Sequence, residues 1–321
     1  MIGMSLNKKA PETLPSPVPP VPPPRRRRAR VPMILLILVL LMVGATWTGY
    51  RLYDEPFQLF NQNRIGAVAD KLWRNQKAVA VVALGSTPLR HATLDESAMA
   101  KLGARHGIKS LLFLRIVNET AEFADFEPML EHILRLRPAL VLLDLDLAFV
   151  ERKDLFFYPA YLELLADVVE RGRPYLRDQV ELQYGKPCAR RDTPDWEASA
   201  NPNLHLAELR AMLDLRADSP ALDRVRSFVV TARAAGIRVA LLPLPKTVAV
   251  AGPLSVAPDR AAEHLHVPVW SYPHRLDDRR DFCDFAHLTP EAREAYSDWL
   301  TGQIAEALSR PAVEEVSSLA K

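Results

Sequence analysis

The stretch that decides the fold is Ala78 to Ser86, which reads AVAVVALGS. Its apolar part is continuous and of strand length, which is typical of a strand covered on both faces, as in a parallel sheet. Gly85 and Ser86 end the run, and Thr87 and Pro88 follow as turn residues. We therefore expect a buried strand that delivers Ser86 to the edge of a parallel sheet.

Helices and further strands alternate around this stretch. Helix-like spacing over residues 57–74 precedes it, and a capping box of Thr93 and Glu96 predicts a helix that ends at Gly107. Two more apolar strands are predicted over 110–117 and 139–145, with a helix over 123–136 between them. Strand and helix alternating at this rhythm predict right-handed crossovers and a parallel sheet.

The second half of the chain is less regular. Residues 171–203 mix proline, glycine and charges without a clear period, and we interpret them as an insertion that lies over the sheet. The remaining predicted elements are helices over 161–170, 205–215, 220–235, 260–264 and 290–309, and strands over 237–242 and 267–270. The expected domain therefore covers 78–310, after a linker helix over 51–77 and before a short tail, 311–321.

Residues 31–50 are a segment of a different kind. They form an uncharged apolar run of about twenty residues, the length of a helix that crosses a bilayer. Residues 1–30 before them are basic and proline-rich, which predicts a disordered tail. Four consecutive arginines, 25–28, and Arg30 stand before the run, whereas only Arg51 follows it directly. The positive-inside rule therefore predicts a cytoplasmic N-terminus and an exported body; a cleaved signal peptide fits the long proline-rich leader poorly.

Charge and cysteine content narrow the function classes. The chain has 41 Lys and Arg against 39 Asp and Glu, but the tail is strongly basic, so the body is mildly acidic and shows no footprint for nucleic acid. Cys188 and Cys283 both follow the membrane segment, where oxidation is permitted, and both one disulfide and two buried free thiols remain open. His264 and His266 lack a carboxylate or cysteine to complete a metal set, so neither a metal nor a cofactor is expected.

Asp284 and His287 carry the second signal. An acid and an imidazole three residues apart, held before a helix that Thr289 caps, make half of a nucleophilic triad. Ligands collect outside the carboxyl ends of parallel strands, so Ser86 and this loop are expected at one sheet edge. We interpret Ser86 as the nucleophile, His287 as its base and Asp284 as the carboxylate that orients His287.

Other polar residues near this edge have weaker claims. His91, five residues after Ser86, is a rival base. Arg90 and Lys246 lie in loops that border the same cleft, where they could meet an anionic substrate, although solvated surface charge is the simpler interpretation.

The order of these parts resembles the SGNH (GDSL-like) hydrolase superfamily: a strand ending in Gly85-Ser86, alternating helices and parallel strands, and a late Asp284-x-x-His287 before the last helix. With one N-terminal membrane helix and an exported body, the chain is most similar to the membrane-anchored branch that includes DltD-like and AlgJ-like proteins. The resemblance covers about 78–309 and implies a three-layer α/β/α fold with a serine acyl-enzyme.

The chain departs from the superfamily at the oxyanion donors. A Gly after the second strand and an Asn after the third usually donate, but this chain has Asn118 near the first place and Asp144 and Asp146 at the second. A carboxylate repels an oxyanion, so we expect Asn118 to donate instead, beside the backbone N–H of Ser86.

The resemblance implies an esterase or O-acyltransferase in the bacterial inner membrane with a periplasmic main domain. Its expected substrate is an acyl group, chiefly acetyl, on an envelope or exported polysaccharide. A multispanning O-acyltransferase or a polysaccharide synthase is the expected partner. The alternative is a catalytically inactive SGNH-like scaffold or adaptor of a polysaccharide synthesis or export complex.

Overall fold

The computed structural model shows an α/β body with one parallel sheet, and it divides the chain into two units, Met1–Ala45 and Thr46–Lys321. The structure describes residues 30–53, 55–151, 166, 169–170, 177–186, 188, 216, 218–247, 257–277, 280–284 and 286–310. The predicted tails, the helices over 161–170 and 205–215, and most of the insertion lie wholly or largely outside these residues.

Four parallel strands form the sheet in the order β2-β1-β3-β4. They are β1 (Val79–Ser86), β2 (Leu111–Asn118), β3 (Leu140–Asp144) and β4 (Arg238–Leu242). The chain leaves β1 for β2 on one side and returns to β3 on the other, so the strand order reverses between β1 and β3. Ligands of open parallel sheets bind at such a switch point, outside the carboxyl ends of the strands.

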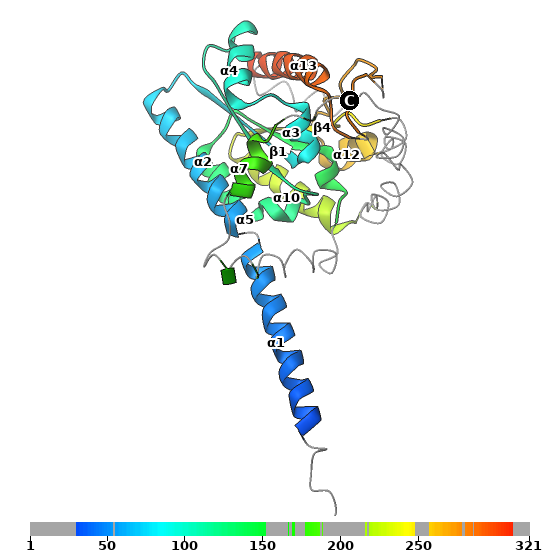
Figure 1. Cartoon of the computed structure of the whole chain (residues 1–321). Helices are drawn as coiled ribbons and strands as arrows, with labels where there is room; N and C mark the ends of the chain where they lie inside the picture. The colour runs from blue at the N-terminus through cyan, green and yellow to red at the C-terminus, as the bar shows by residue number, and fades with distance from the viewer. Residues whose placement is uncertain are drawn as a thin grey trace, which may run out of the picture. The chain divides into compact units, whose positions relative to one another are not determined.

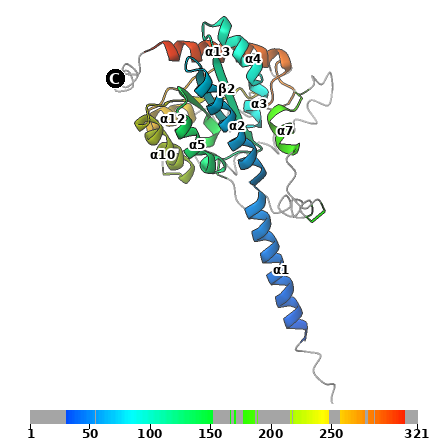
Figure 2. The same cartoon turned by 90° about the vertical axis from the view of Figure 1, so that its left-hand side faces the viewer.

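Helices cover both faces of the sheet (Figures 1 and 2). The core on one face includes α2 (Glu55–Arg74), α5 (Glu127–Leu136), α10 (Pro220–Ala234) and α12 (Ala257–Leu265); the core on the other includes α3 (Thr87–Ala92), α4 (Glu96–Arg105) and α13 (Pro290–Ser309). Val82 lies in the first core and Val81 in the second, and neither is exposed. Burial on both faces explains why β1 is apolar at every position from Val79 to Leu84 rather than at alternate ones.

The helix after β1 differs from the prediction. Thr93 does not cap α4; its hydroxyl donates to the carbonyl of Leu89, 2.7 Å away, at the end of the unpredicted helix α3. Asp95 caps α4 instead and accepts the backbone N–H of Ala98 at 2.8 Å. The predicted cap was wrong because the threonine hydroxyl forms its hydrogen bond with a carbonyl of α3 instead.

Two other elements are shorter than predicted. The helix expected over 123–136 starts as a 3-10 turn, η1 (Phe123–Phe126), before α5 begins. The fifth strand is reduced to one parallel bridge between Leu241 and Val269. Pro268 has no N–H to donate, so it contributes only its carbonyl, which accepts from Leu241 at 2.9 Å.

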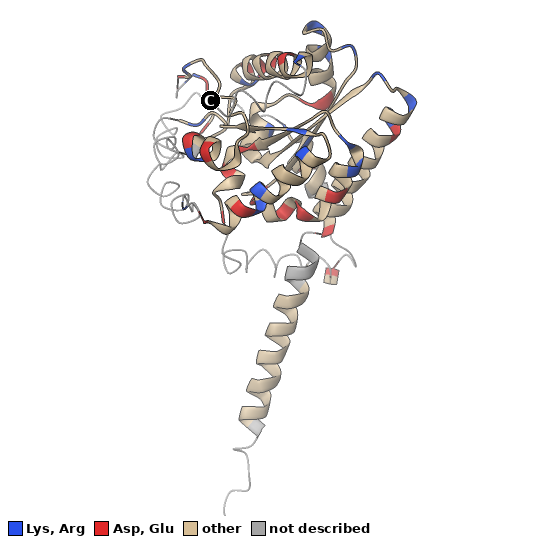
Figure 3. Cartoon of the chain, turned by 180° about the vertical axis from the view of Figure 1, so that it is seen from behind, with Lys and Arg blue, Asp and Glu red and all other residues tan. Residues whose placement is uncertain are grey.

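Helix α1 (Arg30–Tyr53) has 24 residues and is therefore about 36 Å long. Its window Val31–Thr48 has a mean hydropathy of 2.3, and apolar side chains such as Leu41, 63% exposed, cover it. Charged residues are spread over the body, whereas the ribbon of α1 shows none between its ends (Figure 3). The charged residues of the helix are Arg30 and Arg51, one near each end. The helix is long and apolar enough to span a membrane.

The cap of α10 provides a test of the fold. The Ser219 hydroxyl, fully buried, accepts the backbone N–H of Leu222 at 3.2 Å. We expect Ser219→Ala to lower the free energy of unfolding by about 1 kcal/mol, because the first turn loses its acceptor. In a domain of this size the melting temperature should fall by about 2–4 °C, measured by thermal unfolding of the detergent-solubilised chain.

Ser227→Ala is the matched control, because this exposed hydroxyl on α10 bonds only to the carbonyl of Asp223 within its own helix. It should change the free energy by less than about 0.5 kcal/mol. Equal losses in the two variants would contradict the assigned cap.

Candidate active site

Asp284 and His287 form a hydrogen-bonded pair. Asp284 Oδ2 lies 2.7 Å from His287 Nδ1, and Oδ1 accepts the backbone N–H groups of Ala286 and His287, each at 2.9 Å. Burial raises the pKa of Asp284, but the hydrogen bond and charge of His287 and the two backbone donors outweigh it, so the pKa lies below its usual value. An ionised Asp284 can only accept, which places the proton of the pair on Nδ1 and leaves Nε2 as the reactive nitrogen.

The loop that carries this pair is closed by backbone bonds. The Cys283 N–H donates to the His287 carbonyl at 2.8 Å, and Phe282 and Leu288 form an antiparallel bridge on either side. Helix α13 starts immediately afterwards, with Thr289 as its N-cap. The imidazole is therefore held on a short turn rather than on a free loop.

Ser86 is the last residue of β1, and its polar atoms face Asp144 at the end of β3. The Ser86 hydroxyl donates to Asp144 Oδ2 at 2.9 Å, and the Ser86 backbone N–H donates to the same oxygen at 3.3 Å. Gly85 permits this approach, since a Cβ there would lie 2.9 Å from the Cβ of Asp144 and 3.0 Å from that of Leu89. The N–H expected to meet an oxyanion is thus engaged by a carboxylate.

Asp144 belongs to a buried charge network. Its Oδ1 accepts the backbone N–H of Asp146 at 3.2 Å, and Asp146 Oδ2 accepts from Lys246 Nζ at 2.6 Å. Burial, followed by the charge of Asp146, raises the pKa of Asp144 to about 6, although Lys246 and the backbone donors oppose the rise. The interpretation of Lys246 as a solvated surface charge is wrong, because its side chain is only 8% exposed and pairs with Asp146.

His91 connects α3, the helix that follows Ser86, to the Asp284–His287 pair. Its ring lies against that of His287, with the ring centres 4.1 Å apart, and Arg90 Nη2 is 2.6 Å from its Nε2. Burial, with the charges of His287, Arg90 and Arg293, lowers the pKa of His91 to about 3. Such a ring stays neutral and accepts from Arg90 at Nε2, which does not suit the rival base that the sequence suggested.

Helix α3 separates Ser86 from the Asp284–His287 pair. Ser86 precedes this helix and His91 lies in its last turn, and five helical residues advance about 7.5 Å. Within the described residues, no hydrogen bond joins Ser86 to His287. The ring of His287 thus lies against α3, the helix that follows Ser86, without a bond that would close a triad.

Asn118 lies beside Ser86 as its register partner on β2. Its Oδ1 accepts the backbone N–H of Glu119 at 3.0 Å, so the donor end of the amide, Nδ2, is the end left for a ligand. The side chain is 9% exposed. Its role as oxyanion donor remains a prediction.

The structure joins Cys188 and Cys283 in a disulfide with Cα atoms 6.2 Å apart. The alternative of two free thiols is therefore wrong. Cys188 follows α7 (Arg177–Tyr184), in which Gln183 pairs with the edge of β2: Oε1 accepts the N–H of Val117 at 3.1 Å, and Nε2 donates to its carbonyl at 2.5 Å. A described part of the expected insertion thus lies against the sheet edge and is tied to the residue before Asp284.

Arg115 is a residue that the sequence analysis missed. It is 1% exposed, and its guanidinium donates to the carbonyls of Thr93 and Gln183, both at 2.6 Å. Burial lowers its pKa to about 9. The only signal was a single arginine within an apolar strand, and its role is to hold the α3–α4 connection and α7 against β2.

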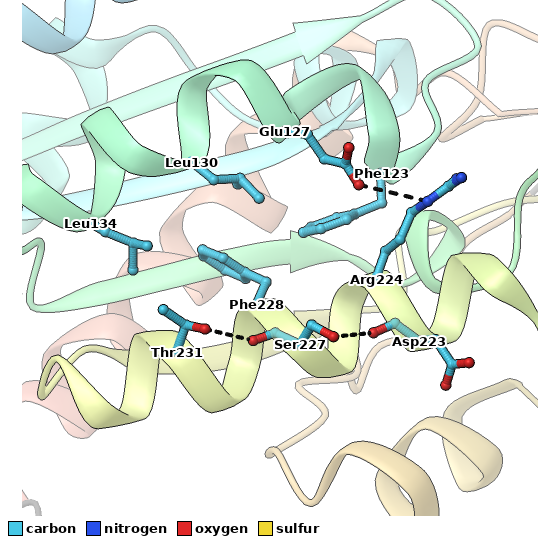
Figure 4. Close-up of a pocket in the computed structure, with 9 residues that line it drawn as sticks. All are labelled: Phe123, Glu127, Leu130, Leu134, Asp223, Arg224, Ser227, Phe228 and Thr231. Carbon is cyan, nitrogen blue, oxygen red and sulfur yellow. Dashed lines mark hydrogen bonds and ion pairs between the residues drawn. The ribbon is translucent and has the colours of Figure 1, made fainter.

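A groove of about 460 Å³ lies between α5 and α10, away from these residues (Figure 4). The rings of Phe123 and Phe228, 5.7 Å apart, lie in its wall, and Glu127 and Arg224 pair at 3.6 Å. None of the proposed catalytic residues lines it.

Comparison with known proteins adds no relative, since no protein-family model and no curated protein matches the chain. In the part of the chain that the structure describes, no group of three or more His, Cys, Asp or Glu side chains is placed to hold a metal ion. The fold and the contacts described above define the class: a parallel α/β body in which β1 ends in a serine and a separate turn holds an acid–histidine pair.

The contact between Gly85 and Asp144 can be tested by adding one methyl group. We expect Gly85→Ala to lower the free energy of unfolding by about 1–3 kcal/mol, because the new Cβ would overlap Asp144 and Leu89. Denaturant unfolding measures the change. Gly66→Ala on α2, where no atom lies within 4 Å of the added Cβ, is the control and should be neutral or stabilising. Equal tolerance at both positions would argue against the close β1–β3 approach.

The disulfide gives a second test. It spans 95 residues, so its removal in a Cys188→Ser, Cys283→Ser double variant should lower stability by about 2–5 kcal/mol. Thermal unfolding with and without reductant measures the effect. Reductant should destabilise the wild type and leave the double variant unchanged, and an equal response in both would show that the bond is not formed.

Proposed function

We propose that this chain is a membrane-anchored serine esterase or O-acyltransferase with a three-layer SGNH-like domain. Ser86 is its nucleophile and forms an acyl-enzyme, and Asp284 and His287 form its acid–base pair. The observation that carries the proposal is the 2.7 Å bond between Asp284 and His287 on a closed turn, with the ring of His287 4.1 Å from that of His91 on the helix that follows Ser86.

The chemistry of acyl transfer accounts for these residue types. A serine hydroxyl attacks an ester carbonyl only when a neighbouring base takes its proton, and a carboxylate that orients an imidazole makes that imidazole an effective acid or base. The Nε2 atom of His287 meets no protein partner among the described residues, and the side chain is 23% exposed, so a substrate oxygen can reach it.

The proposed location and substrate follow from the anchor. Helix α1 holds the body at a membrane, and the arginines before it favour a cytoplasmic N-terminus with the domain in the periplasm. The disulfide between Cys188 and Cys283 fits an oxidising compartment. An acyl group, chiefly acetyl, on an envelope or exported polysaccharide is the substrate class, and a multispanning O-acyltransferase or polysaccharide synthase is the partner.

One observation favours the second candidate function, an inactive adaptor. Asp144 engages both the hydroxyl and the N–H of Ser86, and an ionised carboxylate there opposes an oxyanion. A scaffold that has kept the fold without the chemistry would tolerate this contact.

Labelling of the full-length chain in detergent separates the two functions. We expect a fluorophosphonate probe to modify Ser86, and hydrolysis of p-nitrophenyl acetate to fall on the order of 10³-fold or more in Ser86→Ala. Ser110→Ala, which removes a serine hydroxyl bonded to Asn75 before β2, is the matched control and should keep both activities. Absence of labelling and of Ser86-dependent turnover in the wild type would favour the adaptor.

A further inference from the structure

The Ser86 hydroxyl is already committed to a proton acceptor, and that acceptor is not His287. Serine at the start of a helix normally accepts a backbone N–H with its side chain, yet Ser86, at the N-cap of α3, makes no such bond. Its hydroxyl instead donates to Asp144 Oδ2 at 2.9 Å. The residue thus gives up a stabilising cap for a contact with a buried carboxylate.

The groups that face Asp144 offset its charge only in part, since Lys246 lowers the pKa of Asp144 whereas burial and Asp146 raise it. From η2 (Leu145–Ala148), Asp146 faces it and is itself paired with Lys246, which follows β4. From α13, the fully buried Tyr296 lies near it, and burial together with the charge of Asp144 raises the pKa of that phenol. Among the described residues, no cation makes an ion pair with Asp144 itself.

An oxyanion at Ser86 would form beside this carboxylate. If His287 took the serine proton, the oxyanion and an ionised Asp144 would share a buried edge and repel each other. If Asp144 takes the proton, its charge disappears as the oxyanion forms, and the Ser86 N–H is released from a charged acceptor to bind the oxyanion. The same residue that obstructs the conventional route thus favours the second one.

We propose that Asp144 is the catalytic group that accepts the Ser86 proton when the acyl-enzyme forms, and that the Asp284–His287 pair serves the leaving group and the acceptor hydroxyl. This inference rests on the proposed function, whose site it deepens. In acylation, the Ser86 Oγ–H bond breaks, Oγ bonds to the acyl carbonyl carbon, and the proton moves to Asp144 Oδ2. The tetrahedral intermediate then expels the alcohol oxygen, which takes a proton from Nε2 of His287; in this proposal the ring enters the cycle protonated at both nitrogens, with Asp284 as its counter-ion.

The second half-reaction reverses these transfers. A sugar hydroxyl or water gives its proton to His287 Nε2, and its oxygen bonds to the acyl carbon. Ser86 Oγ leaves and recovers the proton from Asp144. The acyl group has moved from one oxygen to another, and both Asp144 and His287 return to their initial charge states.

The test measures the first turnover separately from the steady state, with the full-length chain in detergent and p-nitrophenyl acetate as substrate. Because p-nitrophenolate leaves without a proton, acylation of this ester needs only the acceptor for Ser86. We expect Asp144→Asn, which keeps the side-chain shape, to slow the p-nitrophenol burst by about 10²-fold to 10⁴-fold. His287→Gln should keep the burst rate within about threefold of wild type and lose steady-state turnover.

The pH dependence of the burst gives an independent readout that does not require a folded Asp144 variant. Burial and Asp146 raise the pKa of Asp144 to about 6, so the burst should slow as pH falls through about 6 and level off above it. The His287→Gln variant should show the same profile, because its remaining acceptor is unchanged.

The outcomes separate this inference from the function on which it rests. A wild-type burst that disappears in His287→Gln and survives in Asp144→Asn would overturn the inference and leave the serine enzyme intact. Absence of any Ser86-dependent burst in the wild type would overturn both. A burst that depends on Asp144, with turnover that depends on His287, would support the assignment of two proton acceptors.

Discussion

The buried carboxylate of Asp144 is the constraint on which the arrangement of this sheet edge depends. A buried charge is costly unless donors surround it, and at this position the donors are the hydroxyl and N–H of Ser86 and the N–H of Asp146. These bonds hold the ends of β1 and β3 together at the point where the strand order reverses. They also explain the glycine before Ser86, since any side chain there would separate the two strands.

A second set of contacts supports the edge from the side of β2. Arg115 has carbonyl oxygens rather than a carboxylate as its nearest partners, so its burial depends on the loop before α4 and on α7 both being in place. Gln183 supplies from a side chain the donor and acceptor that a neighbouring strand would otherwise supply to Val117. With the disulfide, α7 is connected both to the edge strand and to the turn that carries Asp284 and His287.

The proposed SGNH-like function gives Asp144 a specific chemical role. Under that proposal, an aspartate stands where an asparagine donor is expected, and its carboxylate accepts the hydroxyl hydrogen of Ser86 directly. Asn118, the register partner of Ser86, keeps an amide donor on the neighbouring strand. In the proposed mechanism, loss of one donor is offset by removal of the adjacent negative charge during the step that creates the oxyanion.

Much of the framework follows from local patterns. The apolar runs of β1 to β4, the last helix from Pro290 with its Thr289 cap, and the length of the apolar helix α1 are properties of adjacent residues. Each lies within a few residues of its prediction. The proximity of Asp284 and His287 could also be predicted, because residues three positions apart in one turn lie close together. Thr93, by contrast, stands between α3 and α4. The local sequence could not show with which of these helices its hydroxyl would form a hydrogen bond.

Hydrophobic burial and short-range spacing act through neighbouring residues, so the alternation of strands and helices, the apolar N-terminal helix and the acid–histidine turn could be predicted from the sequence. Only the tertiary structure decided that Ser86 meets Asp144, that Lys246 neutralises Asp146 and that Cys188 reaches Cys283. Those contacts join residues 58 to 100 positions apart. Their existence depends on strand order and on the cost of leaving a buried charge unpaired, neither of which is visible in any one stretch of the chain.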